Sequence, residues 1–139
     1  MKRKYIFLLI AVLALAVLFF YRSNPERHAE MFVSMYSNGI EKSIQADEGV
    51  PENLGCLAVN EWPGAHPMTE FTLSGWGIGS GTRYYGCYYS PDDVPLPFQN
   101  AGMALTQDGH DYWTWTGEGD NHGATKKLAD CWYYFEASF

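Results

Sequence analysis

The chain has 139 residues, with nine Lys and Arg against 16 Asp and Glu, and a formal net charge of −7 at pH 7. Four of the basic residues (Lys2, Arg3, Lys4 and Arg22) precede residue 23, so residues 23–139 hold five basic and 16 acidic side chains, a net charge of −11. A domain this acidic is repelled by the phosphates of nucleic acids and by anionic lipid headgroups, which argues against DNA or RNA as a partner.

The first 22 residues have the composition of a membrane segment. An unbroken apolar run extends from Tyr5 to Tyr21, behind a basic start. As a helix this run would measure roughly 25 Å, slightly less than the ~30 Å hydrocarbon core, and Lys4 and Arg22 can lengthen the effective span. The excess of basic residues before the run predicts a cytoplasmic N-terminus.

A retained anchor and a cleaved signal peptide both remain open for this segment, because a charged start and a short apolar core are typical of both. Cleavage favours small residues one and three positions before the cut, and Ala29 has Arg27 two residues before it. We therefore expect a transmembrane signal-anchor with its cytoplasmic tip at residues 1–22. A single β-rich domain at residues 23–139 would lie outside, in the periplasm or the extracellular space, on the cell membrane.

The segment that follows the anchor predicts an amphipathic helix. Asn24 suits the N-cap and Pro25 the first turn. Apolar side chains then recur every four residues, at Phe32, Tyr36, Ile40 and Ile44. Gly39 weakens the middle, so a split into two helices stays open.

The remaining sequence predicts an antiparallel sheet. Short runs rich in aromatic and β-branched residues are separated by Gly, Pro, Asn and Asp. The expected strands are residues 54–62, 69–76, 82–90, 101–106, 111–116 and 128–139. Asp108-Gly109 predicts a hairpin turn. The fold class is therefore α+β, with an N-terminal transmembrane helix and an amphipathic helix packed on an antiparallel sheet of about 5–6 strands.

The last strand has one nearly all-apolar face, formed by Cys131, Tyr133, Phe135, Ala137 and Phe139. We expect this face to contact the helix around Phe32 and Tyr36. Chain ends are usually loose unless a strand or helix docks them. We therefore expect this segment to be a docked, central strand and not a frayed tail.

Three cysteines, Cys56, Cys87 and Cys131, predict one disulfide and one free thiol in an oxidising compartment. Cys87 and Cys131 both lie in aromatic strand candidates, which favours a Cys87–Cys131 pair. The two pairings with Cys56 stay open.

Two pairs of residues are candidates for binding. Trp113 and Trp115 alternate with threonines, so both indoles lie on one face of a strand. If the two indoles face outward, they would form a stacking platform for sugars or a partner. If they face inward, which is the favoured interpretation, they are part of the core. Asp92 and Asp93 are adjacent in a proline-rich loop and are the second pair.

Two turns hold candidates for calcium binding, because Ca²⁺ prefers several oxygen ligands: Asp108, Asp111, Glu118 and Asp120. Their spacing does not match an EF-hand, and solvated turn residues are the simpler interpretation. No cofactor and no catalytic residue is predicted. The glycine-rich stretch from Gly75 to Gly81 lacks the last Gly of G-x-G-x-x-G, which favours a tight bend. Ser80 is not in a nucleophile elbow, because the G-x-S-x-G pattern needs glycine two positions to either side and the chain has Ile78 and Thr82 there.

In the order of its parts the chain resembles type IV pilins and pseudopilins: an apolar N-terminal helix, an amphipathic extension, an antiparallel sheet and late cysteines. It departs from them at Lys4-Tyr5, where a prepilin has Gly-Phe or Gly-Met, and it has no acid before Glu26. The resemblance implies a structural subunit, which stays an alternative, as does an envelope hydrolase or glycan-binding domain. Our main expectation is a single-pass, membrane-anchored extracytoplasmic module that binds a protein of the envelope without catalysis.

Overall fold

The computed structural model, described over residues 2–51, 54–78 and 81–139, contains two helices and one antiparallel sheet of seven strands. The helices are α1 (Lys2–Ser23) and α2 (Pro25–Gln45). The strands are β1 (Ala58–Trp62), β2 (Met68–Trp76), β3 (Arg83–Tyr89), β4 (Thr106–Gln107), β5 (Tyr112–Thr116), β6 (His122–Ala129) and β7 (Trp132–Ser138), with a short 3-10 turn, η1 (Phe98–Asn100), before β4. Their spatial order is β1-β2-β3-β7-β6-β5-β4.

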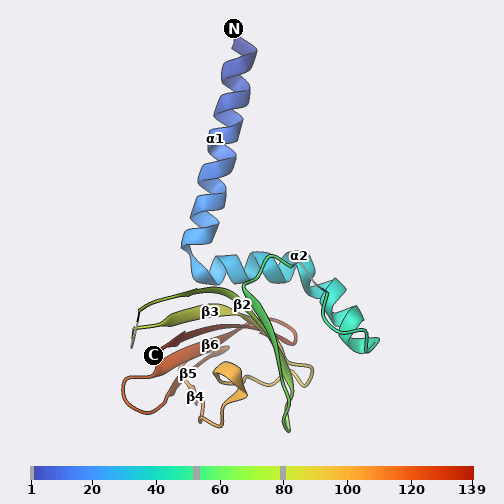
Figure 1. The fold of residues 1–139 in the computed structure, drawn as a ribbon, viewed down its shortest axis with the longest axis vertical. Coiled ribbons are helices and arrows are strands. Elements are labelled where there is room, and N and C mark those ends of the chain that lie inside the picture. Colours follow the sequence, from blue (N-terminus) through green and yellow to red (C-terminus); the bar gives the residue numbers. More distant parts are fainter. Residues whose placement is uncertain (1, 52–53, 79–80) are drawn as a thin grey trace.

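Helix α1 projects away from the sheet, with its apolar surface uncovered (Figure 1). The exposed fractions of Tyr5, Phe7 and Phe19 are 67%, 71% and 76%. Among the described residues no single helix is long and apolar enough to cross a membrane. The two segments Tyr5–Phe20 and Pro25–Gln45, bent by 106° at their junction, meet the requirement for length and composition together.

Helix α2 begins and packs as its sequence predicts. The Asn24 side chain accepts a hydrogen bond from the Arg27 backbone N–H at 3.2 Å, which satisfies one of the free amides of the first turn. The helix continues through Gly39 without the split that remained open. Its buried stripe, which includes Phe32 and Ile40, packs on one face of the sheet against Phe71, Leu73, Cys87, Tyr89, Trp132 and Tyr134.

The opposite face of the sheet is covered by the segment between β3 and β4. Leu96 and Phe98 of this segment are buried in a second cluster with Met68, Tyr88, Trp115, Tyr133, Phe135 and Ala137. The Tyr88 hydroxyl accepts a hydrogen bond from the Leu96 N–H at 2.8 Å and lies 2.8 Å from Thr125 Oγ1. The sheet is therefore buried on both faces, by α2 on one and by residues 94–105 on the other (Figure 1).

Strand β7 is central, as predicted, because it pairs with β3 on one side and with β6 on the other. The predicted orientation of its faces is wrong. Trp132 and Tyr134 face α2, and the Trp132 indole N–H donates to Glu41 at 2.7 Å. Tyr133 and Phe135 point to the other side of the sheet. Since both faces of the sheet are covered, both sets of β7 side chains include buried aromatic residues, and alternation alone did not distinguish the two faces.

The structure also revises the predicted strands of the second half of the sheet. Strand β6 was not predicted, and it raises the number of strands from the expected 5–6 to seven. The predicted strand 128–139 is interrupted by a turn, where Cys131 has a φ of 64°. The predicted strand 101–106 shares only Thr106 with β4, which consists of Thr106 and Gln107. The Asp108-Gly109 hairpin is confirmed, since the Asp108 N–H donates to the Tyr112 carbonyl at 3.0 Å between β4 and β5.

The predicted glycine-rich bend connects β2 to β3, and its residues Gly79 and Ser80 lie outside the described residues. Gly77 has a φ of 145°, and a Cβ there would lie 2.3 Å from the Gly81 carbonyl oxygen. The close approach of two backbones, rather than a phosphate, thus accounts for glycine at this position.

Candidate functional site

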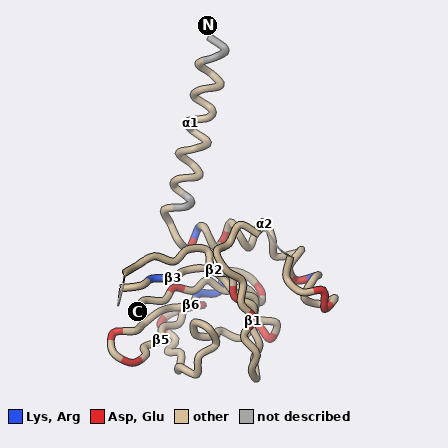
Figure 2. Tube along the Cα trace, viewed as in Figure 1, with Lys and Arg blue, Asp and Glu red and all other residues tan. Residues whose placement is uncertain are grey.

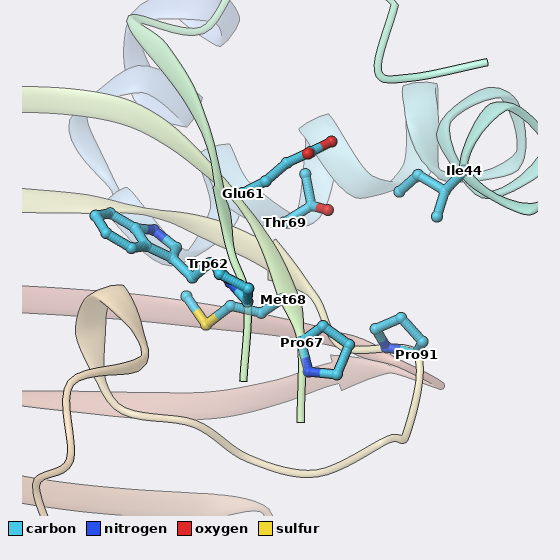
Figure 3. A pocket seen from close by; sticks show the side chains of 8 residues that line it. Ile44, Glu61, Trp62, Pro67, Met68, Thr69 and Pro91 are labelled. Atoms are coloured by element: carbon cyan, nitrogen blue, oxygen red, sulfur yellow. The ribbon is translucent and has the colours of Figure 1, made fainter. Parts of the chain in front are cut away.

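A pocket of about 390 Å³ opens where the end of α2 approaches the β1–β2 hairpin (Figure 3). Its lining comes from α2, from the hairpin and from the loop after β3, and is mainly apolar: Ile44, Glu61, Trp62, Pro63, Pro67, Met68, Thr69 and Pro91. Proline cannot donate to a strand ladder, so Pro63 and Pro67 end β1 and precede β2. The turn between them places Trp62 opposite Met68. The pocket therefore suits an apolar side chain, with the Glu61 carboxylate available to a basic one.

Two further pockets, of about 580 and 530 Å³, lie along strand β1. The first is formed by β1 and the segment before it, and includes Val50, Leu54 and Val59. The second is shared by Ala58 and Asn60 with residues of the opposite sheet face, among them Tyr84 and Phe98. We call residues 57–62 the β1 edge, because among the described residues β1 pairs with β2 alone and ends the sheet. These three pockets therefore all adjoin the β1 edge.

Glu70 is a buried carboxyl group directly behind this edge. It lies on β2 opposite Asn60 of β1, has no exposed surface, and accepts a hydrogen bond from the Gln99 N–H at 3.1 Å. Its second oxygen, Oε1, and the buried Nε1 of Trp62 have no hydrogen-bond partner within residues 2–51, 54–78 and 81–139. Burial raises the pKa of Glu70 to about 7, although the Gln99 N–H and the nearby Trp62 indole both favour the ionised form.

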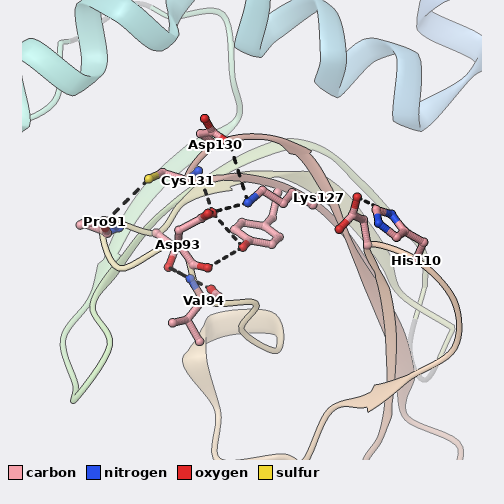
Figure 4. A network of polar contacts seen from close by, with 10 residues as sticks. Pro91, Asp93, Val94, His110, Lys127, Asp130 and Cys131 are labelled. Atoms are coloured by element: carbon pink, nitrogen blue, oxygen red, sulfur yellow. Dashed lines mark hydrogen bonds and ion pairs between the residues drawn. The ribbon is translucent and has the colours of Figure 1, made fainter.

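Asp93, one of the predicted binding residues, is the centre of a polar network that fastens the loop after β3 to the β6–β7 turn (Figure 4). Its carboxylate pairs with Lys127 and accepts the Cys131 N–H at 2.9 Å and the Tyr133 hydroxyl at 3.0 Å. The hydrogen bond from Lys127 holds the pKa of Asp93 below its ordinary value. With its acceptors used inside the chain, Asp93 has a structural role in this network.

Asp92 points elsewhere, toward the β1–β2 hairpin. Its Oδ2 lies 3.0 Å from His66 Nδ1, and both side chains are about half exposed. The Asn100 side chain donates to the His66 carbonyl at 3.0 Å. Asp92 and Asp93 therefore do not form one site, since each joins a different pair of loops.

The two tryptophans are placed in the core cluster on the face away from α2. Trp115 is 2% exposed and Trp113 is partly buried. The Trp113 ring centroid lies 6.3 Å from that of Tyr133, and the Trp115 centroid lies 6.3 Å from that of Phe139. The rings thus pack on the sheet, as in the inward interpretation.

The calcium candidates are divided between two turns at opposite ends of β5. Asp108 and Asp111 lie in the β4–β5 turn, whereas Glu118 and Asp120 lie in the β5–β6 turn. Asp111 pairs with His110 at 2.7 Å. In the described part of the chain no three His, Cys, Asp or Glu side chains form a group that could hold a metal ion.

The predicted Cys87–Cys131 disulfide is wrong. All three thiols are free. In the β3–β7 register Cys87 is opposite Tyr134, and the Cys131 carbonyl accepts the Ser90 N–H at 2.8 Å, three positions further along the ladder. Three residues of a strand span roughly 10 Å, more than the ~7 Å between Cα atoms that a disulfide can bridge. The prediction failed because Cys131 lies in a turn and not within a strand.

Sequence reasoning missed both Glu70 and the β1 edge. The signal for Glu70 was an acid between Thr69 and Phe71 in an otherwise uncharged strand candidate, a pattern that the apolar alternation obscured. The edge position of β1 depends on the strand order, which the sequence does not display. Comparison with known proteins found no matching family model, curated protein or solved structure.

Proposed function

We propose that this protein is a single-pass, membrane-anchored module that is held outside the cytoplasm and binds another protein of the envelope without catalysing a reaction. The observation that carries the proposal is the uncovered apolar surface of α1. Thirteen large apolar side chains between Tyr5 and Phe20 are more than half exposed. At about 1.5–3 kcal/mol for each fully buried side chain, transferring this surface from water into lipid would stabilise the anchored state by on the order of 20 kcal/mol.

The bend between the helices supports the same proposal. With α1 across a bilayer, the 106° angle would set α2 roughly parallel to the membrane surface, with the sheet on its far side. The β1–β2 hairpin extends from the side of the sheet remote from the free end of α1 (Figure 1). The β1 edge and its pockets would then face the aqueous compartment, where a partner can reach them.

The test is crosslinking in cells with the full-length chain, followed by membrane fractionation and purification of the crosslinked complex. Leu13→Arg places a charge at the middle of α1, where insertion scales assign arginine a cost of about 3 kcal/mol. Met35→Arg is the matched control, because Met35 is an exposed apolar residue of α2 (63% exposed). We expect Leu13→Arg alone to leave the membrane fraction and to lose its crosslinked partner.

Two results would contradict the proposal. If both arginine variants fractionate like the unaltered protein, α1 is not the anchor. If the anchored protein forms no crosslinked complex with a second protein, it is not an interaction module.

A further inference from the structure

We propose that the β1 edge binds an extended, basic segment of the partner protein, which adds to the sheet as a further antiparallel or parallel strand beside β1. This inference rests on the proposed function and deepens it, because it names the surface of the module and the chemistry of what binds there. Strand addition of this kind takes its affinity from main-chain hydrogen bonds and its specificity from pockets for alternate side chains.

The first support is the state of the two sheet edges. An edge strand presents alternate N–H and C=O groups that lack a ladder partner, and proteins protect such edges with short strands, lysines, prolines or bulges. Strand β4 is protected by its length of two residues. Strand β1 has five residues, Ala58–Trp62, without Lys or Pro, and it pairs with β2 in an unbroken register. Within the described part of the chain no strand lies on its outer side.

The second support is the position of the pockets. Successive side chains of an added strand point to opposite faces of the sheet. The pocket that includes Leu54 and Val59 borders the α2 side of β1, where Leu54 is part of the core beneath α2. The pocket that includes Asn60 and Phe98 borders the other side. Alternate apolar side chains of an added strand therefore have a receiving pocket on each face, while Leu57 and Val59 beside them are 67% and 38% exposed.

The third support is charge, and it selects the occupant. Residues 43–82 contain no Lys or Arg, and the described part of this segment carries three exposed acids, Asp47, Glu48 and Glu61. Figure 2 shows the cations of the sheet on β3 and β6, and those of β6 are already paired, Lys126 with Glu26 and Lys127 with Asp93. A basic segment is thus attracted to this side of the domain. A second copy of the chain, which would bring its own net charge of −11 over residues 23–139, is repelled.

The experiment uses the full-length protein in detergent micelles and a short synthetic peptide that alternates valine with lysine and threonine. Binding is measured by fluorescence anisotropy, and the protected amides are located by hydrogen exchange with mass spectrometry. We expect protection to be centred on residues 57–62. The same peptide with glutamate in place of lysine should bind with an affinity at least about tenfold lower. A peptide N-methylated on its β1-facing amides should not bind.

Val59→Lys adds a charge on the edge and should weaken peptide binding by about tenfold or more. Ile78→Lys is the matched control, since it adds the same charge at a fully accessible apolar residue (97% exposed) beyond β2 and should leave the affinity unchanged. The N-methylated peptide keeps the test valid even where Val59→Lys disturbs folding.

Protection centred elsewhere, equal affinity for the N-methylated peptide, or equal losses in both lysine variants would overturn the inference. So would protection of residues 57–62 by self-association without peptide. If the cellular complex persists in Val59→Lys, the inference fails and the proposed function stands. If no complex forms with the unaltered protein, the proposed function itself fails.

Discussion

Replacing Glu70 by glutamine should make the stability of this protein less dependent on pH. The carboxyl group has no exposed surface, and its Oε2 accepts a hydrogen bond from the Gln99 N–H, while its Oε1 has no partner in the part of the chain that the structure describes. Glutamine keeps the shape of the side chain and an oxygen that can accept the Gln99 N–H. It removes the ability to ionise, so the change isolates the effect of burying a titratable group.

The magnitude follows from the pKa of Glu70, which burial raises from 4.5 to about 7. Below pH 4.5 the carboxyl group is protonated in the folded and the unfolded chain, and its contribution to stability is fully present. As the pH rises toward 7, the unfolded chain releases the proton first, so that contribution is lost and reaches its minimum above the folded pKa. At about 1.36 kcal/mol per pKa unit, the loss amounts to roughly 3 kcal/mol.

The assay is urea unfolding of the full-length protein in detergent micelles at a series of pH values between 4 and 8. Glu70→Gln and the unaltered protein should have similar free energies of unfolding near pH 4.5, and the variant should be more stable by roughly 3 kcal/mol at pH 8. Glu61→Gln is the matched control, because Glu61 is exposed on the adjacent strand β1. Its free energy of unfolding should follow that of the unaltered protein throughout.

A constant difference between Glu70→Gln and the unaltered protein across the pH series would show that Glu70 does not titrate with a raised pKa. A variant that becomes less stable at pH 8 would also contradict the raised pKa, because that result would mean that the folded protein holds Glu70 ionised through favourable contacts.

Three further experiments test the packing of the core. Phe135→Ala should cost about 3–5 kcal/mol in thermal or urea unfolding, because this ring is 1% exposed and packs on Phe98, whereas exposed Glu136→Ala should cost little; equal, small effects would mean that β7 is not in the core. Gly86→Ala should lower the melting temperature strongly, since a Cβ there would lie 2.0 Å from the Phe71 carbonyl oxygen, whereas Gly102→Ala, with nothing within 4 Å, should be tolerated. Iodoacetamide should modify Cys56 and Cys131 before Cys87 in the native protein, because burial leaves Cys87 without exposed surface and raises its thiol pKa; intact and peptide mass spectra that show Cys87 modified first would contradict the packing of β3.

The elements that the sequence predicted well are those whose signals are local. The start of α2 at Asn24-Pro25 is predicted by a capping residue and a proline in the first turn. The apolar stripe that includes Phe32 and Ile40 is predicted by a period of about four residues. The Asp108-Gly109 hairpin likewise depends on adjacent residues alone. Strand β6 was not predicted because His122 to Lys127 contains no Phe, Tyr or Trp, and its place between β5 and β7 is decided by pairing with both.

The features of the candidate site depend on contacts between distant segments, which a single sequence does not reveal. Glu70 is buried because residues 94–105 fold over its face of the sheet and bring the Gln99 N–H to it. Among the described strands β1 is at an edge because the second half of the chain adds its strands beyond β3 instead of beside β1. The faces of β7 were assigned wrongly for the same reason, since the cover provided by Phe98 was not foreseen.

Mass spectrometry of membranes treated with protease from the extracytoplasmic side tests whether α1 anchors an outward-facing domain. We expect a membrane-protected fragment that begins at Met1 and ends near Ser23, together with degradation of the domain that follows. A mature chain that begins beyond Ser23, or a domain that stays intact while α1 is digested, would contradict this topology.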